Sequence, residues 1–369
     1  MKVKHLFTYD IIPGNVYNIP DVPHSVFWDL SYKCNLRCRF CYNDSELFLQ
    51  SNPSKENTSK IMDILADWGV REILYLGGEP LLYPGFKSII QHGALHSINQ
   101  RIVTNGTLLN DSISSFLYEH NVEVGVSLHG IDEQTHDKMA QLSGAFNLVM
   151  SGIESLINNR VPWFLQYTLT RVNSTILSVA NWLKDNYGDN ARYIDINRLL
   201  PRGVGANNKD TIFPLEEEWW RSIQDIPRIY DLGISARVES IPHCWIRTLA
   251  RRDGVSKIDM KRIISSVRSC YLAINQIAIN PQGKFKLCPG STDFSESIVN
   301  VSPRLIWKHH PILLERRRLE FLPSCCINYE KKTICDHFYS CGGGCKMSIC
   351  GKEPRIGASD PLTCNSCNY

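Results

Sequence analysis

The sequence lacks a hydrophobic run long enough to cross a membrane. A transmembrane helix needs about 18 or more consecutive apolar residues, and no such stretch occurs in the 369 residues. The opening residues contain Asp10, Pro13 and Gly14 where a secretory signal peptide has its apolar core. We therefore expect a cytoplasmic protein with no membrane partner.

The sequence also lacks a marked excess of charge of either sign. It has 40 Lys and Arg residues against 37 Asp and Glu residues, a formal net charge of +3. A charge this small does not favour binding to nucleic acid or to an anionic membrane surface. The sequence has no internal repeat of fixed period, and its length is enough for one large α/β domain and a smaller one.

Cysteine, in contrast, is abundant, with 14 residues. In a reducing compartment, closely spaced cysteines indicate metal ligands or redox centres in preference to disulfides. The alternative, inert buried thiols, fits the isolated Cys244 better than it fits the clusters. Three cysteines lie within residues 34–41, and ten lie between Cys270 and Cys367.

Residues 25–200 alternate between strand and helix patterns. Strands are predicted at 25–30, 71–76, 101–105, 122–128, 162–169 and 192–200. Helices are predicted between them at 58–69, 85–97, 111–120 with Asp111 as N-cap, 145–159 and 174–187. This alternation predicts parallel strands joined by helical crossovers. The predicted fold class is therefore α/β, as a partial (β/α)6 TIM-like barrel.

The pattern changes after residues 199–210, which are rich in Gly, Asn and basic residues. The segment that follows reads as mostly helical, and short strands and loops carry the cysteines from position 270 onward. We predict four parts, which are an N-terminal segment at 1–24, the barrel at 25–210, a helical bridging region at 211–265 and a cysteine-rich domain at 266–369.

Cys34, Cys38 and Cys41 follow the first predicted strand with C-x3-C-x2-C spacing. In a parallel barrel, the loops after the strands carry the chemistry. Soft thiolates favour zinc, Cu(I) or iron–sulfur clusters. A structural zinc site needs a fourth ligand, but the next histidine is His92 and the next cysteine is Cys244. Three thiolates therefore favour a [4Fe–4S] cluster that keeps one iron open.

This motif, in this place, resembles that of the radical SAM enzymes. Further motifs of the family follow in order, as "GGEP" at 77–80, "TNG" at 104–106, "SLHG" at 127–130, "GAF" at 144–146 and "QYTLTRVN" from Gln166. The resemblance implies that a reduced cluster on the three cysteines cleaves S-adenosylmethionine (SAM) to a 5′-deoxyadenosyl radical, which abstracts hydrogen from a substrate. It also implies a set of SAM-binding residues, namely Phe40, Gly77, Gly78, Glu79, Pro80, Asn105, Ser127, Gln166 and Thr168.

His129 departs from the family pattern, since related chains usually have Asp in that place. A tolerated loop residue and a role near the substrate are both open interpretations.

The C-terminal cysteines resemble the SPASM extension, which binds auxiliary [4Fe–4S] clusters. "CDHFYSCGGGC" at 335–345 and "DPLTCNSC" at 360–367 carry the likeness, and Lys332 stands where the extension usually has a cysteine. The resemblance implies that Cys270, Cys288 and Cys345 bind a nearer cluster. An outer cluster would take Cys335, Cys341, Cys364 and one of Cys325 or Cys326, with Cys326 preferred. A fourth ligand of the nearer cluster would come from Cys244, Cys350 or Cys367, or its iron would be open. A zinc ribbon is the alternative.

The substrate is predicted by resemblance alone. The first hypothesis is crosslinking, oxidation or epimerisation of a ribosomally made peptide, with flavodoxin or ferredoxin as electron donor. Because 24 residues precede the first predicted strand, we expect a leader peptide to need a separate binding protein or another surface. The alternative substrate is a small metabolite or haem precursor. A non-catalytic electron carrier or sensor is a third interpretation. We also expect the substrate to lie between the barrel mouth and the extension, beside the nearer cluster.

Overall fold

All six predicted strands form, and each is parallel to the next. They are β1 (Ser25–Ser31), β2 (Glu72–Gly77), β3 (Asn99–Thr104), β4 (Glu123–Leu128), β5 (Trp163–Thr168) and β6 (Ala191–Asn197). The computed structural model describes residues 19–173, 175–239, 241–317, 327–328, 333–334 and 345. Predictions for Cys325, Cys326, Cys335, Cys341, Cys350, Cys364 and Cys367 lie outside the described residues.

Four further strands extend this sheet on both sides. β7 (Ser235–Val238) is parallel to β6, and β8 (Gln276–Ile279) is parallel to β1. β9 (Lys284–Lys286) and β10 (Asp293–Ser297) follow β8 as antiparallel strands. The strand order is β10-β9-β8-β1-β2-β3-β4-β5-β6-β7, and β11 (Ile327–Asn328) pairs separately with β12 (Thr333–Ile334). Segments on both sides of the predicted boundary at 265/266 therefore belong to one sheet.

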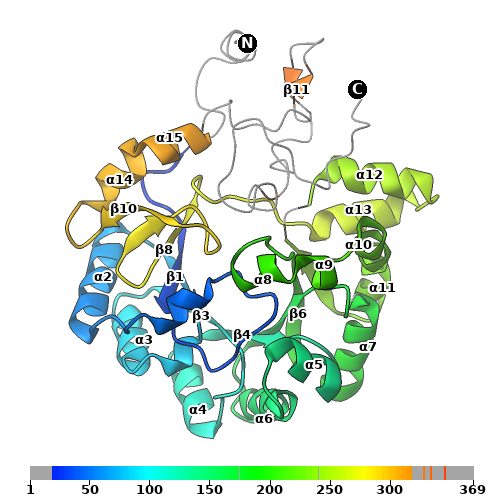
Figure 1. The fold of residues 1–369 in the computed structure, drawn as a ribbon, viewed down its shortest axis with the longest axis horizontal. Helices are drawn as coiled ribbons and strands as arrows, with labels where there is room; N and C mark the ends of the chain where they lie inside the picture. Colours follow the sequence, from blue (N-terminus) through cyan, green and yellow to red (C-terminus); the bar gives the residue numbers. More distant parts are fainter. Residues whose placement is uncertain are drawn as a thin grey trace.

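Helices cover the outside of the curved sheet (Figure 1). The crossover helices are α2 (Lys55–Trp68), α3 (Phe86–Leu95), α4 (Asp111–Glu119), α6 (Ala145–Asn158) and α7 (Ile176–Tyr187). α2 shows how the sequence sets such a helix. Ser54 caps its start by accepting a hydrogen bond from the backbone N–H of Asn57, and Gly69 ends it with φ of 98°. Its buried face, with Ile61, Leu65 and Trp68, packs on the core.

Two local predictions need correction. The N-cap of α4 is Asn110 and not Asp111, because the Asn110 side chain accepts the hydrogen bond from the backbone N–H of Ile113. Asp111 is the first helical residue, where its negative charge still suits the helix N-terminus. α5 (Glu133–Ala140) was not predicted, although Asp132 caps it by accepting from the backbone N–H of Thr135 at 2.8 Å.

The remaining helices flank the barrel and its mouth. They are η1 (Ser45–Leu49), η2 (Pro80–Leu82), α8 (Gly203–Asn207), α9 (Lys209–Ile212), α10 (Glu216–Ile223), α11 (Ile226–Asp231), α12 (His243–Arg252), α13 (Lys257–Ser266), α14 (Pro303–His309) and α15 (Pro311–Arg317). Among the described residues, no helix is both long and apolar enough to span a membrane.

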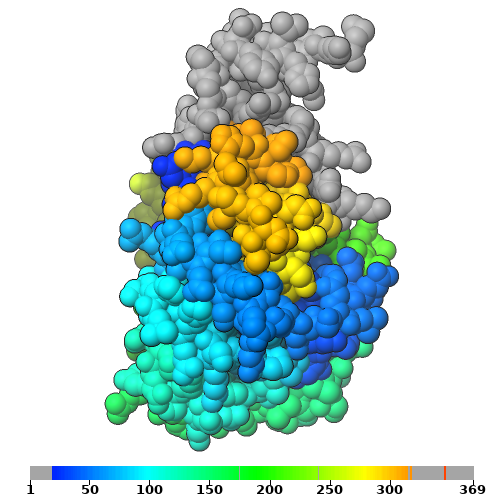
Figure 2. Space-filling model, turned by 90° about the vertical axis from the view of Figure 1, so that its left-hand side faces the viewer, coloured from blue at the N-terminus to red at the C-terminus, as the bar shows by residue number. Residues whose placement is uncertain are grey.

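The C-terminal part of the described chain packs directly on the barrel. Figure 2 shows α14 and α15 against the N-terminal helices, and the Arg304 guanidinium donates to the backbone oxygen of Asp67 at 3.0 Å. A buried ion pair makes a second connection, since Lys286 Nζ on β9 lies 2.5 Å from Asp29 Oδ2 on β1. The two side chains are 4% and 1% exposed. Because Lys286 Nζ also donates to the backbone oxygen of Pro289 at 2.5 Å, the pair holds the loop after β9 against the barrel.

Candidate active site

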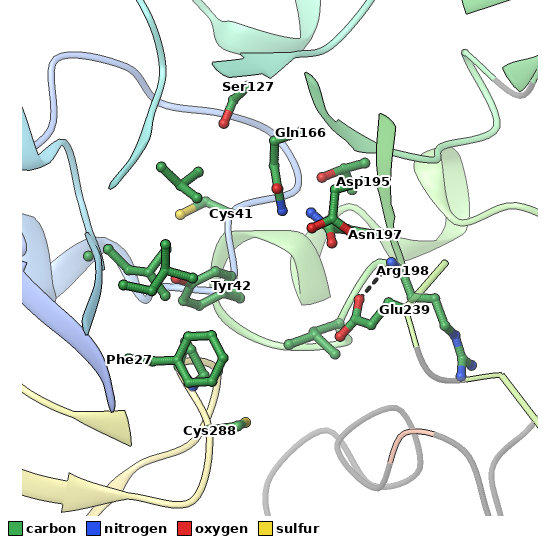
Figure 3. A pocket seen from close by; sticks show the side chains of 18 of the residues that line it. Phe27, Cys41, Tyr42, Ser127, Gln166, Asp195, Asn197, Arg198, Glu239 and Cys288 are labelled. Carbon is green, nitrogen blue, oxygen red and sulfur yellow. Dashed lines mark hydrogen bonds between the residues drawn. The ribbon is translucent and has the colours of Figure 1, made fainter. Parts of the chain in front are cut away.

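The carboxyl ends of the parallel strands open into a cavity of about 790 Å³. Residues from both cysteine regions and from the loops after the strands line it. Figure 3 looks into this cavity, with Ser127 and Gln166 at the top, Asp195 and Asn197 to the right, and Cys288 at the bottom. Segments that are almost two hundred residues apart in the chain therefore share one site, as the positions of Cys41 and Glu239 on opposite sides of the cavity show.

The loop with Cys34, Cys38 and Cys41 lines one wall. Backbone hydrogen bonds hold it from two sides. The N–H of Arg39 donates to the oxygen of Met139 in α5 at 3.0 Å, and the oxygen of Cys41 accepts from the N–H of Gly205 in α8 at 2.9 Å. Two helices that follow other strands thus fix the conformation of the loop.

The three thiols lie in a desolvated and mutually interacting group. Burial raises the pKa of Cys34, raises the pKa of Cys41 to about 11, and raises the pKa of Cys38 well above its usual range. Ionisation of Cys41 and Cys34 raises the pKa of Cys38 further. Three thiolates are stable here only beside a strong positive charge, which bound metal ions supply. The donor set therefore fits the [4Fe–4S] cluster predicted from the spacing.

The "GGEP" segment lies against the cysteine loop so closely that only glycine fits. Gly77 has φ of 120°, and a Cβ there would lie 2.2 Å from the backbone oxygen of Ser31. A Cβ on Gly78 would lie 2.2 Å from the backbone oxygen of Lys33. The N–H of Gly78 instead donates to Ser31 O at 2.7 Å. Because glycine has no side chain, the backbone of Gly77 and Gly78 is exposed to the cavity, which both residues line.

Glu79 braces this edge from behind. Its carboxylate accepts hydrogen bonds from the N–H of Leu81 at 3.0 Å, the hydroxyl of Thr104 at 2.8 Å and the N–H of Asn105 at 2.7 Å. Burial raises the pKa of Glu79 to about 7. Neither Glu79 nor Pro80 is among the residues that line the cavity, and both are buried. Glu79 therefore joins the "GGEP" segment to the "TNG" segment.

Seven of the nine residues predicted to bind SAM line the cavity: Phe40, Gly77, Gly78, Asn105, Ser127, Gln166 and Thr168. Strand register explains part of this arrangement. Ser127, Gln166 and Asp195 are neighbours across β4, β5 and β6, so their side chains form one row. The Asn105 amide donates to Asn35 Oδ1 at 2.8 Å and lies 3.9 Å from Cys34 Sγ. Their role as SAM contacts stays a prediction.

A charged wall was missed at the sequence level. Asp195 Oδ1 accepts a hydrogen bond from the Arg268 guanidinium, and Glu239 Oε2 accepts from the backbone N–H of Arg198 at 2.8 Å (Figure 3). Burial raises the pKa of Glu239. The alternation in "YIDIN" carried a signal for Asp195 and Asn197, because period-2 residues face one side of a strand. No local pattern indicated Arg198, Glu239 or Arg268, because their segments come together only in the folded chain.

Cys270, Cys288 and Cys345 line the same cavity. Cys288 and Cys345 are buried and pack together with Leu200 and Leu272. Burial raises the pKa of Cys288 to about 12, and the neighbouring Cys270 contributes to this shift. The three residues assigned to the nearer auxiliary cluster therefore line one cavity, with Cys288 and Cys345 buried and Cys270 half-buried.

Cys244 lies apart from these sites. It is on α12 and is not among the residues that line the cavity.

Comparison with known proteins finds similar sequences and similar folds. The Radical SAM superfamily model matches residues 28–175. The chain is 24% identical over 324 residues to the AdoMet-dependent heme synthase of Methanosarcina barkeri, covering 85% of this chain and 90% of that protein. It is 24% identical over 343 residues to the mycofactocin maturase MftC of Mycolicibacterium smegmatis, covering 88% and 78%. Its fold is similar to that of Streptococcus suis SuiB bound to the precursor peptide SuiA, with a TM-score of 0.66 at 14% identity, covering 89% of this chain and 73% of that one. Residues 28–175, which hold the three-cysteine loop, therefore match the Radical SAM superfamily.

Proposed function

We propose that this chain is a radical SAM enzyme that abstracts hydrogen from a ribosomally made peptide. The observation that carries the proposal is the desolvated thiol group of Cys34, Cys38 and Cys41, which lies beside a glycine-exposed backbone edge in a large cavity. Cys34, Cys38 and Cys41 would hold a [4Fe–4S] cluster there, which would supply the electron for the reductive cleavage of SAM. The residues of the chain position SAM and substrate and exclude water.

The roles of the SAM-binding residues follow the family motifs. The backbone edge at Gly77 and Gly78 would accept hydrogen bonds from the methionine ammonium group, and Phe40 would lie beside the adenine. Asn105 and Ser127 would contact the methionine and ribose portions, and Gln166 or Thr168 would reach the ribose. Two observations support this assignment, which are the exposure of all these residues to one cavity and the rigid support that Glu79 and Thr104 give to the "GGEP" edge. Such fixed geometry is what positioning catalysis requires.

We extend the proposal to the second thiol group. Cys270, Cys288 and Cys345 would hold an auxiliary [4Fe–4S] cluster of a SPASM-like domain, which would supply an electron acceptor in the same cavity as the first cysteine loop. The substrate would lie between the two groups. Cys326, Cys335, Cys341 and Cys364 stay predicted ligands of an outer cluster. The four-part domain division also stays a prediction.

The substrate class has two candidates. A peptide is favoured by the similarity to mycofactocin maturase and by the fold shared with peptide-bound SuiB. In that case a flavodoxin or ferredoxin would supply electrons, and the leader peptide would bind to a separate protein or to another surface of this chain. A haem precursor is the second candidate. It is favoured by the likeness to the heme synthase and by Arg198, Arg268 and Arg316 in the cavity lining, because guanidinium groups bind carboxylates well.

The cluster assignment is tested by replacing Cys34, Cys38 and Cys41 with Ala. After anaerobic reconstitution, the variant is expected to contain about four fewer iron atoms per chain than the wild type and to form no 5′-deoxyadenosine with dithionite and SAM. Cys244→Ala is the matched control, since this thiol lies outside the cavity lining, and it should retain SAM cleavage. Wild-type amounts of 5′-deoxyadenosine from the triple variant would contradict the assignment.

The substrate class is tested by offering each candidate to the wild-type enzyme. A short peptide encoded next to the gene, or an iron coproporphyrin, is incubated with SAM and reductant, and products are followed by mass spectrometry. A mass change in the peptide supports the first candidate. A change in the porphyrin alone would replace it by the second.

A further inference from the structure

We propose that His129 donates a hydrogen bond from Nε2–H to the sulfur of Cys38 and so raises the reduction potential of the cluster held there. The inference rests on the proposed function, because it takes Cys38 as a cluster ligand. It assigns a positioning and tuning role to a residue whose sequence context left its role open.

The contact joins two loops that are far apart in the chain. His129 follows β4, and its Nε2 lies 3.6 Å from Cys38 Sγ, a hydrogen-bonding distance for the large sulfur atom. A cysteine that binds metal has lost its proton, so its sulfur can only accept. The nitrogen that faces it must therefore carry the hydrogen, which fixes the tautomer of His129 as Nε2–H.

The ring of His129 has little freedom to leave this position. It stacks on His136 at a centroid distance of 4.9 Å and an interplanar angle of 13°, and Phe40 meets it edge-on at 4.7 Å. The residue is only 4% exposed. A donor held this rigidly keeps its direction whether or not the cluster is reduced.

The backbone of His129 is fixed as well. Its N–H donates to Nδ1 of His136 at 3.2 Å, and its carbonyl oxygen accepts from the Asn173 amide at 2.9 Å. Because Nδ1 of His136 is the acceptor, the hydrogen of that ring lies on Nε2. The two histidines therefore form an ordered pair, in which the first holds the cysteine and the second holds the first.

The expected effect follows from charge. Reduction adds an electron to a cluster whose thiolates are already anionic, and a hydrogen bond to a ligand sulfur stabilises the more negative state. Loss of the donor should make the cluster harder to reduce. We expect the ratio of reduced to oxidised cluster at a fixed potential to fall about tenfold, which is a shift of about 59 mV for one electron.

The test compares two substitutions in the full, anaerobically reconstituted protein. His129→Phe keeps a flat ring in the stack but has no donor, whereas His129→Gln keeps an N–H donor. The reduction potential is measured by redox titration followed by electron paramagnetic resonance (EPR). The signal of the relevant cluster is identified as the one that is absent when Cys34, Cys38 and Cys41 are changed to Ala. The Phe variant should show the tenfold fall, and the Gln variant should lie closer to wild type. His120→Phe is the control, since it also removes an imidazole from a ring contact, with Phe116 on the outer layer.

A second measurement needs no variant to fold. Wild-type protein labelled with ¹⁵N-histidine should show a nitrogen coupling to the reduced cluster in pulsed EPR. Absence of this coupling, or a midpoint potential in the iron-loaded Phe variant equal to that of wild type, would overturn the inference and leave the cluster assignment intact. Equal iron content in wild type and the triple Ala variant would instead overturn the proposed function, and the inference with it.

Discussion

Replacing Lys286 with Met should destabilise the whole fold, because it removes one partner of the buried pair between β9 and β1. Lys286 Nζ lies 2.5 Å from Asp29 Oδ2, and both side chains are almost fully buried. Without Lys286, the Asp29 carboxylate keeps only the hydrogen bond from the Tyr32 hydroxyl, at 3.4 Å. The other carboxylate oxygen of Asp29 already has no hydrogen-bond partner among the described residues.

The magnitude follows from the cost of an uncompensated buried charge. Breaking such a pair from one side typically costs about 3–5 kcal/mol. Replacing both partners with apolar residues of similar volume is often nearly neutral, so the double variant Lys286→Met with Asp29→Leu should recover most of the loss. The second contact of Lys286, to the oxygen of Pro289, is lost in both variants. The loss of this contact therefore cancels when the single and double variants are compared.

The assay is anaerobic urea unfolding followed by circular dichroism. With an m-value of about 3 kcal/mol/M, the single variant should unfold at a urea concentration about 1 M or more below that of wild type. Burial raises the pKa of Asp29 even beside Lys286. A group with a raised folded-state pKa favours folding below its unfolded pKa and loses that contribution as pH rises through the folded value. Because the charge of Lys286 lowers the pKa of Asp29, its removal raises that pKa further, so the deficit of the single variant should grow as pH rises through the wild-type pKa of Asp29. Equal midpoints for wild type and the single variant would refute this reasoning.

Three further predictions concern the cavity. Glu79→Gln should remove a pH-dependent part of the free energy of unfolding, about 3 kcal/mol in size. The wild-type carboxyl has its pKa raised to about 7, so it lowers the free energy of unfolding as pH rises from 5 to 8. Urea midpoints measured across this pH range test the prediction, and an equal dependence on pH in the variant and the wild type would contradict it. Gly78→Ala should abolish SAM binding in equilibrium dialysis, since its Cβ would meet a backbone oxygen at 2.2 Å, whereas Gly144→Ala meets nothing within 4 Å and should retain SAM binding despite its φ of 77°. Cys270→Ala with Cys288→Ala should leave 5′-deoxyadenosine formation largely intact and block the oxidised product; full product yield would assign these thiols a structural role.

The parts of the fold that were predicted correctly carried strong local signals. The six central strands are apolar runs separated by amphipathic helices, and they form where the alternation indicated. β7 was missed because four residues are too few to show a period. The sequence did not distinguish the true cap of α4, Asn110, from Asp111 at the next position, because Asn and Asp are equally good capping residues.

The candidate site divides in the same way. Cysteine spacing and glycine-rich motifs are local, so the cysteine loop and the "GGEP" edge could be predicted before the structure was known. The contact of His129 with Cys38 joins residues 91 positions apart, and the pair of Arg268 with Asp195 joins residues 73 positions apart. Lys286 and Asp29 are separated by 257 positions. No local pattern encodes such contacts, because they depend on which strands become neighbours in the sheet.

The most direct test of the central claim is EPR of the dithionite-reduced protein with and without SAM. The three-cysteine loop and the "GGEP" edge lie in contact and face one cavity. SAM bound at that edge should therefore reach the open iron and change the signal of its cluster. The account predicts a SAM-dependent change in the wild type that is absent when Cys34, Cys38 and Cys41 are replaced by Ala. A wild-type EPR signal that does not change on addition of SAM, or a SAM-dependent change that is also seen in the triple variant, would contradict the account.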